Sequence, residues 1–197
     1  MTAIARIFLA TLAALTLAGC VSWIAPLSDK QVDRHHGTRT LGSKIEDAAI
    51  ERKVWLNIVR GEPTMQKARL VVTSWNGQVL LAGQVPTDAI KQRAAAIAGQ
   101  VRHVLHVHNE LEVGTPIAFI ARMSDGWITT RVKTRLLFGP DVPGRRVKVV
   151  TENGVVYLLG LLTREEAELV VNAARAVYGV QKIVKIFEYI DAEQAGR

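Results

Sequence analysis

Cysteine is almost absent from this chain of 197 residues, since the only one is Cys20. An internal disulfide is therefore excluded. Neither a Cys/His pair nor a Ser/His/Asp set can be assembled for nucleophilic catalysis, and no glycine-rich loop of the phosphate-binding type occurs. These absences argue against an enzyme, so we expect no catalytic residues and no small-molecule substrate.

Long hydrophobic runs are also missing. The apolar stretch Ile7–Leu17 follows the basic Arg6 and is well short of the roughly 20 residues that a membrane-spanning helix needs. Its length is typical of a signal-peptide core. It ends in Leu17-Ala18-Gly19-Cys20, which resembles a bacterial lipobox, the signal in which the cysteine is acylated and the chain is cut before it. The alternative is an ordinary secretory signal with a leftover cysteine, a liability in an oxidising compartment.

The lipobox resemblance implies that residues 1–19 are a signal peptide and that the mature protein begins at Cys20 with a covalent lipid. No other cofactor and no metal is expected. Val21, rather than Asp, follows the cysteine, and in such lipoproteins this implies passage to the outer membrane. We therefore expect a lipid-anchored protein on the periplasmic face of the outer membrane.

Acidic residues are the minority charge. The sequence has 25 Lys and Arg against 18 Asp and Glu, a net charge of +7 that becomes +6 when Arg6 leaves with the signal peptide. A basic balance often indicates nucleic acid, but an exported protein rarely meets any, so we expect no nucleic-acid partner. The remaining large polyanion is a membrane surface of acidic phospholipid or lipopolysaccharide.

What the sequence does contain is an internal repeat. Asn76–Gly83 recurs as Asn153–Gly160, 77 positions later, and the match extends in both directions. The repeat predicts an architecture of two similar domains. We place a tether at 20–43, domain 1 at 44–113, a linker at 114–121, domain 2 at 122–190 and a tail at 191–197. The linker is short and apolar, so we expect it to pack between the domains and fix their orientation.

Each copy predicts the order α-β-β-α-β. The first helix of each copy has apolar residues at i, i+4 and i+8, on one helical face. These core candidates are Ile50, Val54 and Ile58 in copy one and Ile128, Val132 and Leu136 in copy two. Two strands follow, then a second helix that begins near Thr87 or at Thr163, and then a strand of alternating residues. We predict an α+β fold in which each copy is a three-stranded sheet with two helices over one face.

Four glycines are predicted to be structural. Asn-Gly, at Gly77 and again at Gly154, supplies the positive φ angles of a tight hairpin turn. Gly83 and Gly160 are expected to end the second strand of each copy, where a side chain would obstruct a bend or a close backbone approach.

The pattern N-G-x-V-x-L-x-G, together with the closing V-x-x-V strand, resembles the BON domain, and the resemblance covers 44–113 and 122–190. Lipobox, tether and two copies together resemble the dual-BON outer-membrane lipoproteins. One departure is Arg102-His103, where the family tends to have Gly-Val. The resemblance implies a non-enzymatic protein that supports envelope integrity, with division sites as one place of action.

The two copies differ on their first helices. Copy two has an aromatic residue, Trp127, where copy one has Ala49, and its helix carries no acid between Asp125 and Asp141. At 100° per residue, Trp127, Arg131, Thr134 and Phe138 form a stripe well away from the core face. Aromatic residues beside cations are typical of a helix that lies at a membrane interface.

In the dual-BON lipoproteins this helix contacts anionic phospholipid, so the resemblance implies an anionic membrane as partner. The contact candidates carried over by position are Trp127, Ile128, Thr130, Arg131, Lys133, Arg135 and Leu137. Ile128 is the weakest of these because it also lies on the core face. The alternative is that the tryptophan packs against a sheet edge or the other domain and that the cations form a solvated face.

Two other functions stay open. The chain could be a protein-interaction module that docks outer-membrane assembly or division proteins through its strand edges, or a spacer without a specific ligand. A metal site at His106 and His108 is not expected, because the pair shares a strand face without carboxylate or cysteine support.

Overall fold

The computed structural model describes residues 39–66 and 68–191. The predicted lipidation site Cys20, the predicted signal peptide 1–19 and residues 20–38 of the predicted tether lie outside the described residues. None of the described helices combines the length and the apolar character needed to cross a membrane.

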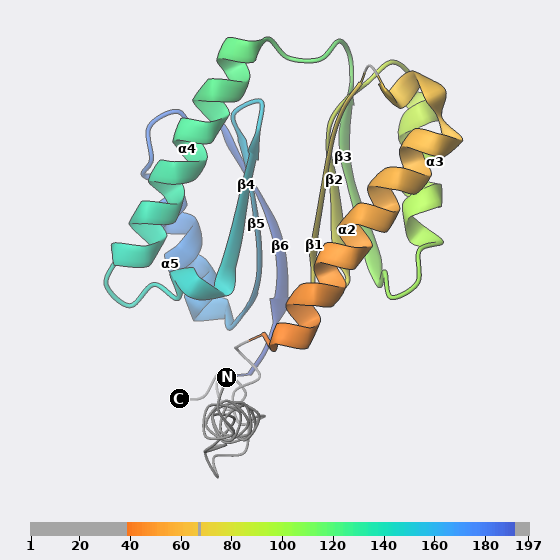
Figure 1. Ribbon diagram of the computed structural model, residues 1–197. Helices are drawn as coiled ribbons and strands as arrows, with labels where there is room; N and C mark the ends of the chain where they lie inside the picture. The colour runs from red at the N-terminus through yellow and green to blue at the C-terminus, as the bar shows by residue number, and fades with distance from the viewer. Residues whose placement is uncertain (1–38, 67, 192–197) are drawn as a thin grey trace, which may run out of the picture. The chain divides into compact units, whose positions relative to one another are not determined.

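Both copies fold in the predicted order, with a short 3-10 turn added to each. Copy one consists of α2 (Leu41–Gly61), η1 (Pro63–Gln66), β1 (Arg69–Trp75), β2 (Gln78–Val85), α3 (Asp88–Gly99) and β3 (His106–Val113). Copy two consists of α4 (Phe119–Phe138), η2 (Gly144–Arg146), β4 (Val147–Glu152), β5 (Val155–Leu162), α5 (Arg164–Arg175) and β6 (Lys182–Tyr189). The predicted α+β fold is confirmed (Figure 1).

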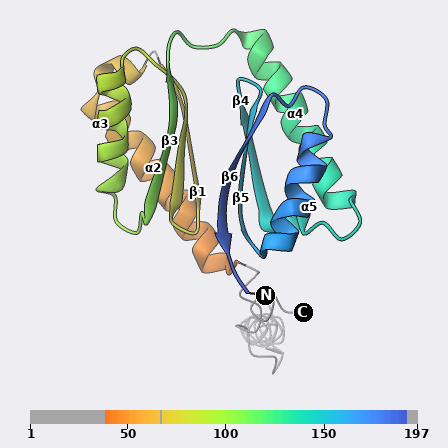
Figure 2. The same cartoon turned by 180° about the vertical axis from the view of Figure 1, so that it is seen from behind.

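Each three-stranded sheet has its second strand in the middle. β2 pairs antiparallel with β1 and parallel with β3, and β5 pairs in the same way with β4 and β6. The parallel pairs need a crossover, which α3 and α5 provide. Figures 1 and 2 show α2 and α3 over one face of the first sheet, and α4 and α5 over one face of the second.

The helical cores are those that the periodicity predicts. One buried cluster in each copy joins the first helix to the sheet and the second helix. All six predicted core residues of α2 and α4 are buried: Ile50, Val54, Ile58, Ile128, Val132 and Leu136. The helix starts are confirmed as well, since Thr87 caps α3, and Thr163 with Glu166 forms a capping box on α5.

The hairpin turns are confirmed, and the second pair of glycines is placed differently. Asn76 and Gly77 have φ of 52° and 76°, as a tight primed turn requires. Gly83, however, lies inside β2 rather than at its end, and Gly160 lies inside β5. The predicted close approach is present at both. A Cβ on Gly83 would lie 2.1 Å from the Arg69 carbonyl oxygen, because Gly83 has a φ of +115°.

The turn before β3 departs from the family pattern in sequence, but its backbone conformation is the same as that of the equivalent turn in copy two. His103 has a φ of 69° and occupies the place of Gly179, whose φ is 96°. The family's Gly-Val therefore corresponds to His103-Val104 rather than to the predicted Arg102-His103, and only the glycine is replaced. A histidine is among the few non-glycine residues that adopt this region readily. The turn before β3 is therefore retained without a glycine.

The segment predicted as a linker is shorter than expected. α4 begins at Phe119, so only residues 114–118 connect the copies. Phe119 and Ile120 are exposed rather than packed between domains, and that part of the expectation is wrong.

The contact between the two copies comes from the sheets instead. A third buried cluster contains Leu80 and Ala82 from β2 together with Tyr157, Leu159 and Ile186 from β5 and β6. Burial in this cluster raises the pKa of Tyr157 far above its usual value. The faces of the sheets that the helices leave uncovered therefore share one apolar core.

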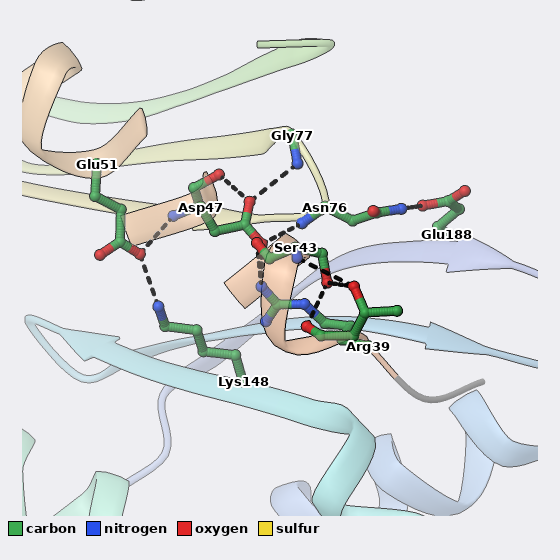
Figure 3. A network of polar contacts seen from close by, with 10 residues as sticks. Arg39, Ser43, Asp47, Glu51, Asn76, Gly77, Lys148 and Glu188 are labelled. Carbon is green, nitrogen blue, oxygen red and sulfur yellow. Dashed lines mark hydrogen bonds and ion pairs between the residues drawn. The ribbon is translucent and has the colours of Figure 1, made fainter. Parts of the chain in front are cut away.

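Polar contacts border this shared core, and two of them are reciprocal. Asn76 Nδ2 donates to Glu188 at 2.8 Å, and the equivalent Asn153 Nδ2 donates to Glu112 at 3.4 Å. Two further ion pairs have no counterpart in the other copy, Arg69–Glu152 at 2.6 Å and Lys148–Glu51 at 2.7 Å. Figure 3 shows the Lys148 and Asn76 contacts.

Candidate functional site

The outer face of α4 collects the predicted contact residues. The side chain of Trp127 is 65% exposed and that of Phe138 is 84% exposed. The others of the predicted set that lie exposed on α4 are Thr130, Arg131, Lys133, Arg135 and Leu137. Ile128 is only 6% exposed and packs in the core, as its place on the helical wheel indicates, so we leave it out of the exposed set.

The apolar part of this face extends further toward the N-terminus than the sequence pattern indicated. Phe119, Ile120 and Met123 are exposed on the first turns of α4. Phe119, Met123 and Trp127 are spaced four residues apart and therefore share one side of the helix. The same spacing is present in the sequence, but the predicted linker, 114–121, includes Phe119 and Ile120 and so separates them from Trp127.

The charge of this face is uncompensated. Within residues 39–66 and 68–191, no ion pair is formed by Arg131, Lys133 or Arg135. The one acid on the helix, Asp125, is buried and accepts the backbone N–H groups of Asn153 and Gly154, both at 2.8 Å. The exposed face of α4 is therefore cationic and apolar, without a carboxylate of its own helix on it.

Sequence reasoning missed the role of this aspartate and of its counterpart Asp47. Asp47 is buried and accepts from the Ser74 hydroxyl at 2.6 Å and from the backbone of Asn76 and Gly77 at 2.9 and 3.1 Å. Arg39 also pairs with Asp47 (Figure 3). Each first helix is thus fastened to the hairpin turn of its own sheet. The signal was the almost equal separation between the aspartate and the Asn-Gly turn in both copies.

A groove opens beside the cationic face, between α4 and the end of α5. Its volume is about 880 Å³. Its lining includes Arg131 and Arg135 from α4, Phe138 at the end of that helix, and Val177 and Tyr178 after α5. Tyr178, which lines the groove, is 90% exposed. Four other hollows in the described part of the chain are smaller, at about 230 to 540 Å³.

The histidines of β3 contact a glutamine. Gln78 Oε1 lies 3.0 Å from His108 Nε2, and Gln78 Nε2 lies 3.2 Å from His106 Nδ1. Burial, and then the neighbouring His106, lower the pKa of His108. In the described ranges no three His, Cys, Asp or Glu residues come together in a way that could hold a metal ion.

Comparison with known proteins identifies both copies. The sequence matches the BON domain over residues 46–115 and again over residues 124–191. It is 36% identical over 179 residues to the outer membrane lipoprotein DolP of Haemophilus influenzae, and this alignment covers 91% of this chain and 93% of that protein. It is 36% identical over 152 residues to the 21 kDa hemolysin of Actinobacillus pleuropneumoniae, covering 77% and 78% of the two chains.

A third relative is more distant. The osmotically-inducible protein Y of Escherichia coli is 29% identical over 146 residues, which covers 73% of this chain and 72% of that protein. This match, too, covers most of both proteins.

Proposed function

The chain belongs to the BON-domain family, and from this we propose that it is a non-enzymatic lipoprotein of the outer membrane whose second domain binds anionic phospholipid through α4. Cys20 would carry the lipid anchor and face the protein toward the periplasm. The similarity to the outer membrane lipoprotein DolP supports the location. A role in envelope integrity, including at division sites, belongs to the same proposal.

One observation carries the lipid-binding part of the proposal. α4 exposes Trp127 together with three cations that have no ion-pair partner within the described ranges. Tryptophan is favoured at the level of lipid headgroups. A Lys or Arg beside an anionic membrane contributes about 1 kcal/mol. Three such cations with an aromatic side chain therefore suffice for a weak membrane contact.

A weak contact is enough because the anchor supplies the first attachment. Two linked binding events multiply residence on a surface through effective concentration. The anchor would hold the protein on the membrane, and α4 would determine which lipid composition it occupies.

Vesicle sedimentation tests the proposal. Residues 21–197, which include every described residue, are mixed with vesicles of phosphatidylglycerol and phosphatidylcholine, or of phosphatidylcholine alone. We expect retention on the anionic vesicles only, and a loss of about tenfold for Trp127→Glu, because a carboxylate replaces the interfacial indole.

Trp55 provides the matched control for this experiment. It is also exposed on a first helix, α2, but belongs to copy one. Trp55→Glu introduces the same chemical change and should leave retention near that of the unaltered chain. Equal retention of the Trp127→Glu protein, or an equal loss with Trp55→Glu, would contradict the proposal.

A further inference from the structure

The groove between α4 and the end of α5 has the dimensions and the lining of a ligand site. Its volume of about 880 Å³ is within the range of roughly 300–1,000 Å³ that small-molecule sites occupy. Its apolar lining comes from Phe138, Val142, Val177 and Tyr178, and Arg131 and Arg135 also line it. An apolar trough beside two cations fits an amphiphile with an anionic head.

One large side chain that packs between the two helices in copy one is replaced by alanine in copy two. α3 and α5 have the same length and equivalent caps, so Ala173 of α5 corresponds to Ile97 of α3. In copy one, Ile97 packs on the core and lies 3.1 Å from the place of a Cβ on Gly61, at the end of α2. In copy two, Ala173 also packs on the core, but its side chain ends at Cβ and the residue lines the open groove. The loss of this side chain leaves the space between the two helices unfilled.

The border of the same gap has also changed its chemistry. In copy one, Arg93 of α3 pairs with Glu62, the residue after α2. The equivalent residues in copy two are Leu169 and Pro140, and Pro140 lines the groove. An ion pair that links the two helices in copy one is thus replaced by apolar residues in copy two. In copy one this place holds Ile97 and the Arg93–Glu62 ion pair, whereas in copy two it is open, apolar and flanked by arginines.

We propose that this groove holds an acyl chain of a single anionic phospholipid, whose phosphate is bound by Arg131 and Arg135. The inference rests on the proposed function and deepens it, because it places one lipid molecule in a defined site beside the membrane-contacting face of α4. The charge complementarity is between the phosphate and two arginines that have no ion-pair partner within the described residues. The chain would be covered by the apolar lining and by the ring of Tyr178.

The first copy supplies the substitution that tests the groove. Ala173→Ile restores the residue that fills the equivalent gap in copy one, and it leaves the arginines of α4 unchanged. Ala48→Ile makes the same change on the exposed surface of α2 and serves as the control. Thermal unfolding of both proteins verifies that they are folded.

Binding is measured with residues 21–197 and dihexanoyl phosphatidylglycerol below its micelle concentration, by chemical shift changes. We expect saturable binding that Ala173→Ile weakens by about tenfold, because the added side chain excludes methylene groups of the acyl chain from contact. Ala48→Ile should bind as the unaltered chain does, and glycerol 3-phosphate, which lacks acyl chains, should not bind measurably. If Ala173→Ile does not fold, Thr134→Leu replaces it, since Leu56 is the equivalent residue in copy one.

A second measurement separates failure of the groove from failure of the proposed function. Phosphatidylglycerol with a photoreactive acyl chain is incorporated into vesicles, and the labelled peptides are identified. Labelling of residues 173–178 that disappears in Ala173→Ile supports the groove. Retention on vesicles with labelling of residues 119–127 alone overturns the groove but keeps the membrane contact of α4. Absence of retention overturns both, and capture of a helical peptide by the groove without any lipid would overturn the assigned ligand.

Discussion

At the scale of single residues, the buried aspartates are the positions with the clearest energetic role. Asp125 satisfies two backbone N–H groups of the Asn153-Gly154 turn, which would otherwise lose their hydrogen-bond partner. Hydrogen bonds to a charged group contribute more than neutral ones, and a buried donor left without a partner costs additional free energy. The carboxylate therefore couples the first turns of α4 to the second sheet.

We predict that Asp125→Ala lowers the free energy of unfolding by about 3 kcal/mol. Denaturant unfolding of residues 21–197 measures this change. Asp88→Ala is the control, because Asp88 is an exposed acid in the first turn of α3, where its interaction with the helix dipole is worth up to about 1 kcal/mol. A loss for Asp125→Ala no larger than that of the control would mean that the turn does not depend on the carboxylate.

The same scale shows what the sequence could and could not reveal about the site. The exposure of Trp127 and Arg131 follows from helical periodicity, because the core face of α4 fixes the opposite face. The burial of Asp125 does not follow, since an acid in a helix is usually solvated and its partner lies about thirty residues away across the fold. Only the repetition of Asp and Asn-Gly at a matched separation carried that information.

At the scale of elements, Gly83 of β2 and Gly160 of β5 occupy equivalent positions but have different backbone conformations. Gly83 has a φ of +115°, and a Cβ there would lie 2.1 Å from the carbonyl oxygen of Arg69. Gly160 does not have a positive φ, and its Cβ would lie 2.9 Å from the carbonyl oxygen of Arg146. Both strands admit close approach of a neighbour, but only β2 also needs the conformational freedom of glycine.

We predict that Gly83→Ala destabilises the chain by about 3 kcal/mol and Gly160→Ala by about 1 kcal/mol. The first substitution combines backbone strain with a steric clash, whereas the second requires only a small shift of Arg146 at the end of η2. The two free energies of unfolding are compared by denaturant titration. Equal losses would indicate that φ at Gly83 is not the cause.

Element order and core faces were predictable, whereas several boundaries were not. The period of apolar residues identifies α2 and α4, and Asn-Gly identifies the hairpins, because both signals are local. The sequence places domain 2 after Ala121, whereas α4 begins at Phe119. Gly114 and Pro116 are typical of a loop, and no side chain caps the helix at Ala118, so no local signal marks this start. Exposed Phe119 and Ile120 then appeared to belong to an apolar linker.

At the scale of the whole described chain, one signal for the contact between the sheets was present in the sequence. β2 and β5 are apolar at consecutive positions (Val79–Ala82 and Val155–Leu159) rather than at alternate ones. A strand that is apolar on both sides is buried on both faces. Helices cover one face of each sheet, so the second face required another partner, and the other sheet provides it. Which polar side chains border that contact could not be inferred, because they come from strands that are distant in sequence.

The ion pair between Arg69 and Glu152 is the sharpest test of this contact. Glu152 is buried, and its Oε2 has no hydrogen-bond partner, while Oε1 accepts from Arg69 at 2.6 Å and from Gln84 at 3.4 Å. The side chain of Arg69 is 27% exposed and can reach water. Removing Arg69 and removing Glu152 therefore have different consequences. Without Arg69 the carboxylate of Glu152 is left charged and buried, whereas without Glu152 the guanidinium of Arg69 can still reach water.

We predict that Arg69→Ala lowers the free energy of unfolding by about 3 kcal/mol, more than Glu152→Ala does, and that the double variant recovers part of the loss. Protease cleavage within residues 114–118 should accelerate in Arg69→Ala, because the sheets separate more often when an unpaired carboxylate is trapped between them. Arg146 and Glu166, paired at 2.8 Å within the second copy, form the control. Arg146→Ala should destabilise that domain without a comparable gain in cleavage at 114–118. A larger loss for Glu152→Ala than for Arg69→Ala would show that the carboxylate stabilises the contact by packing rather than by its charge.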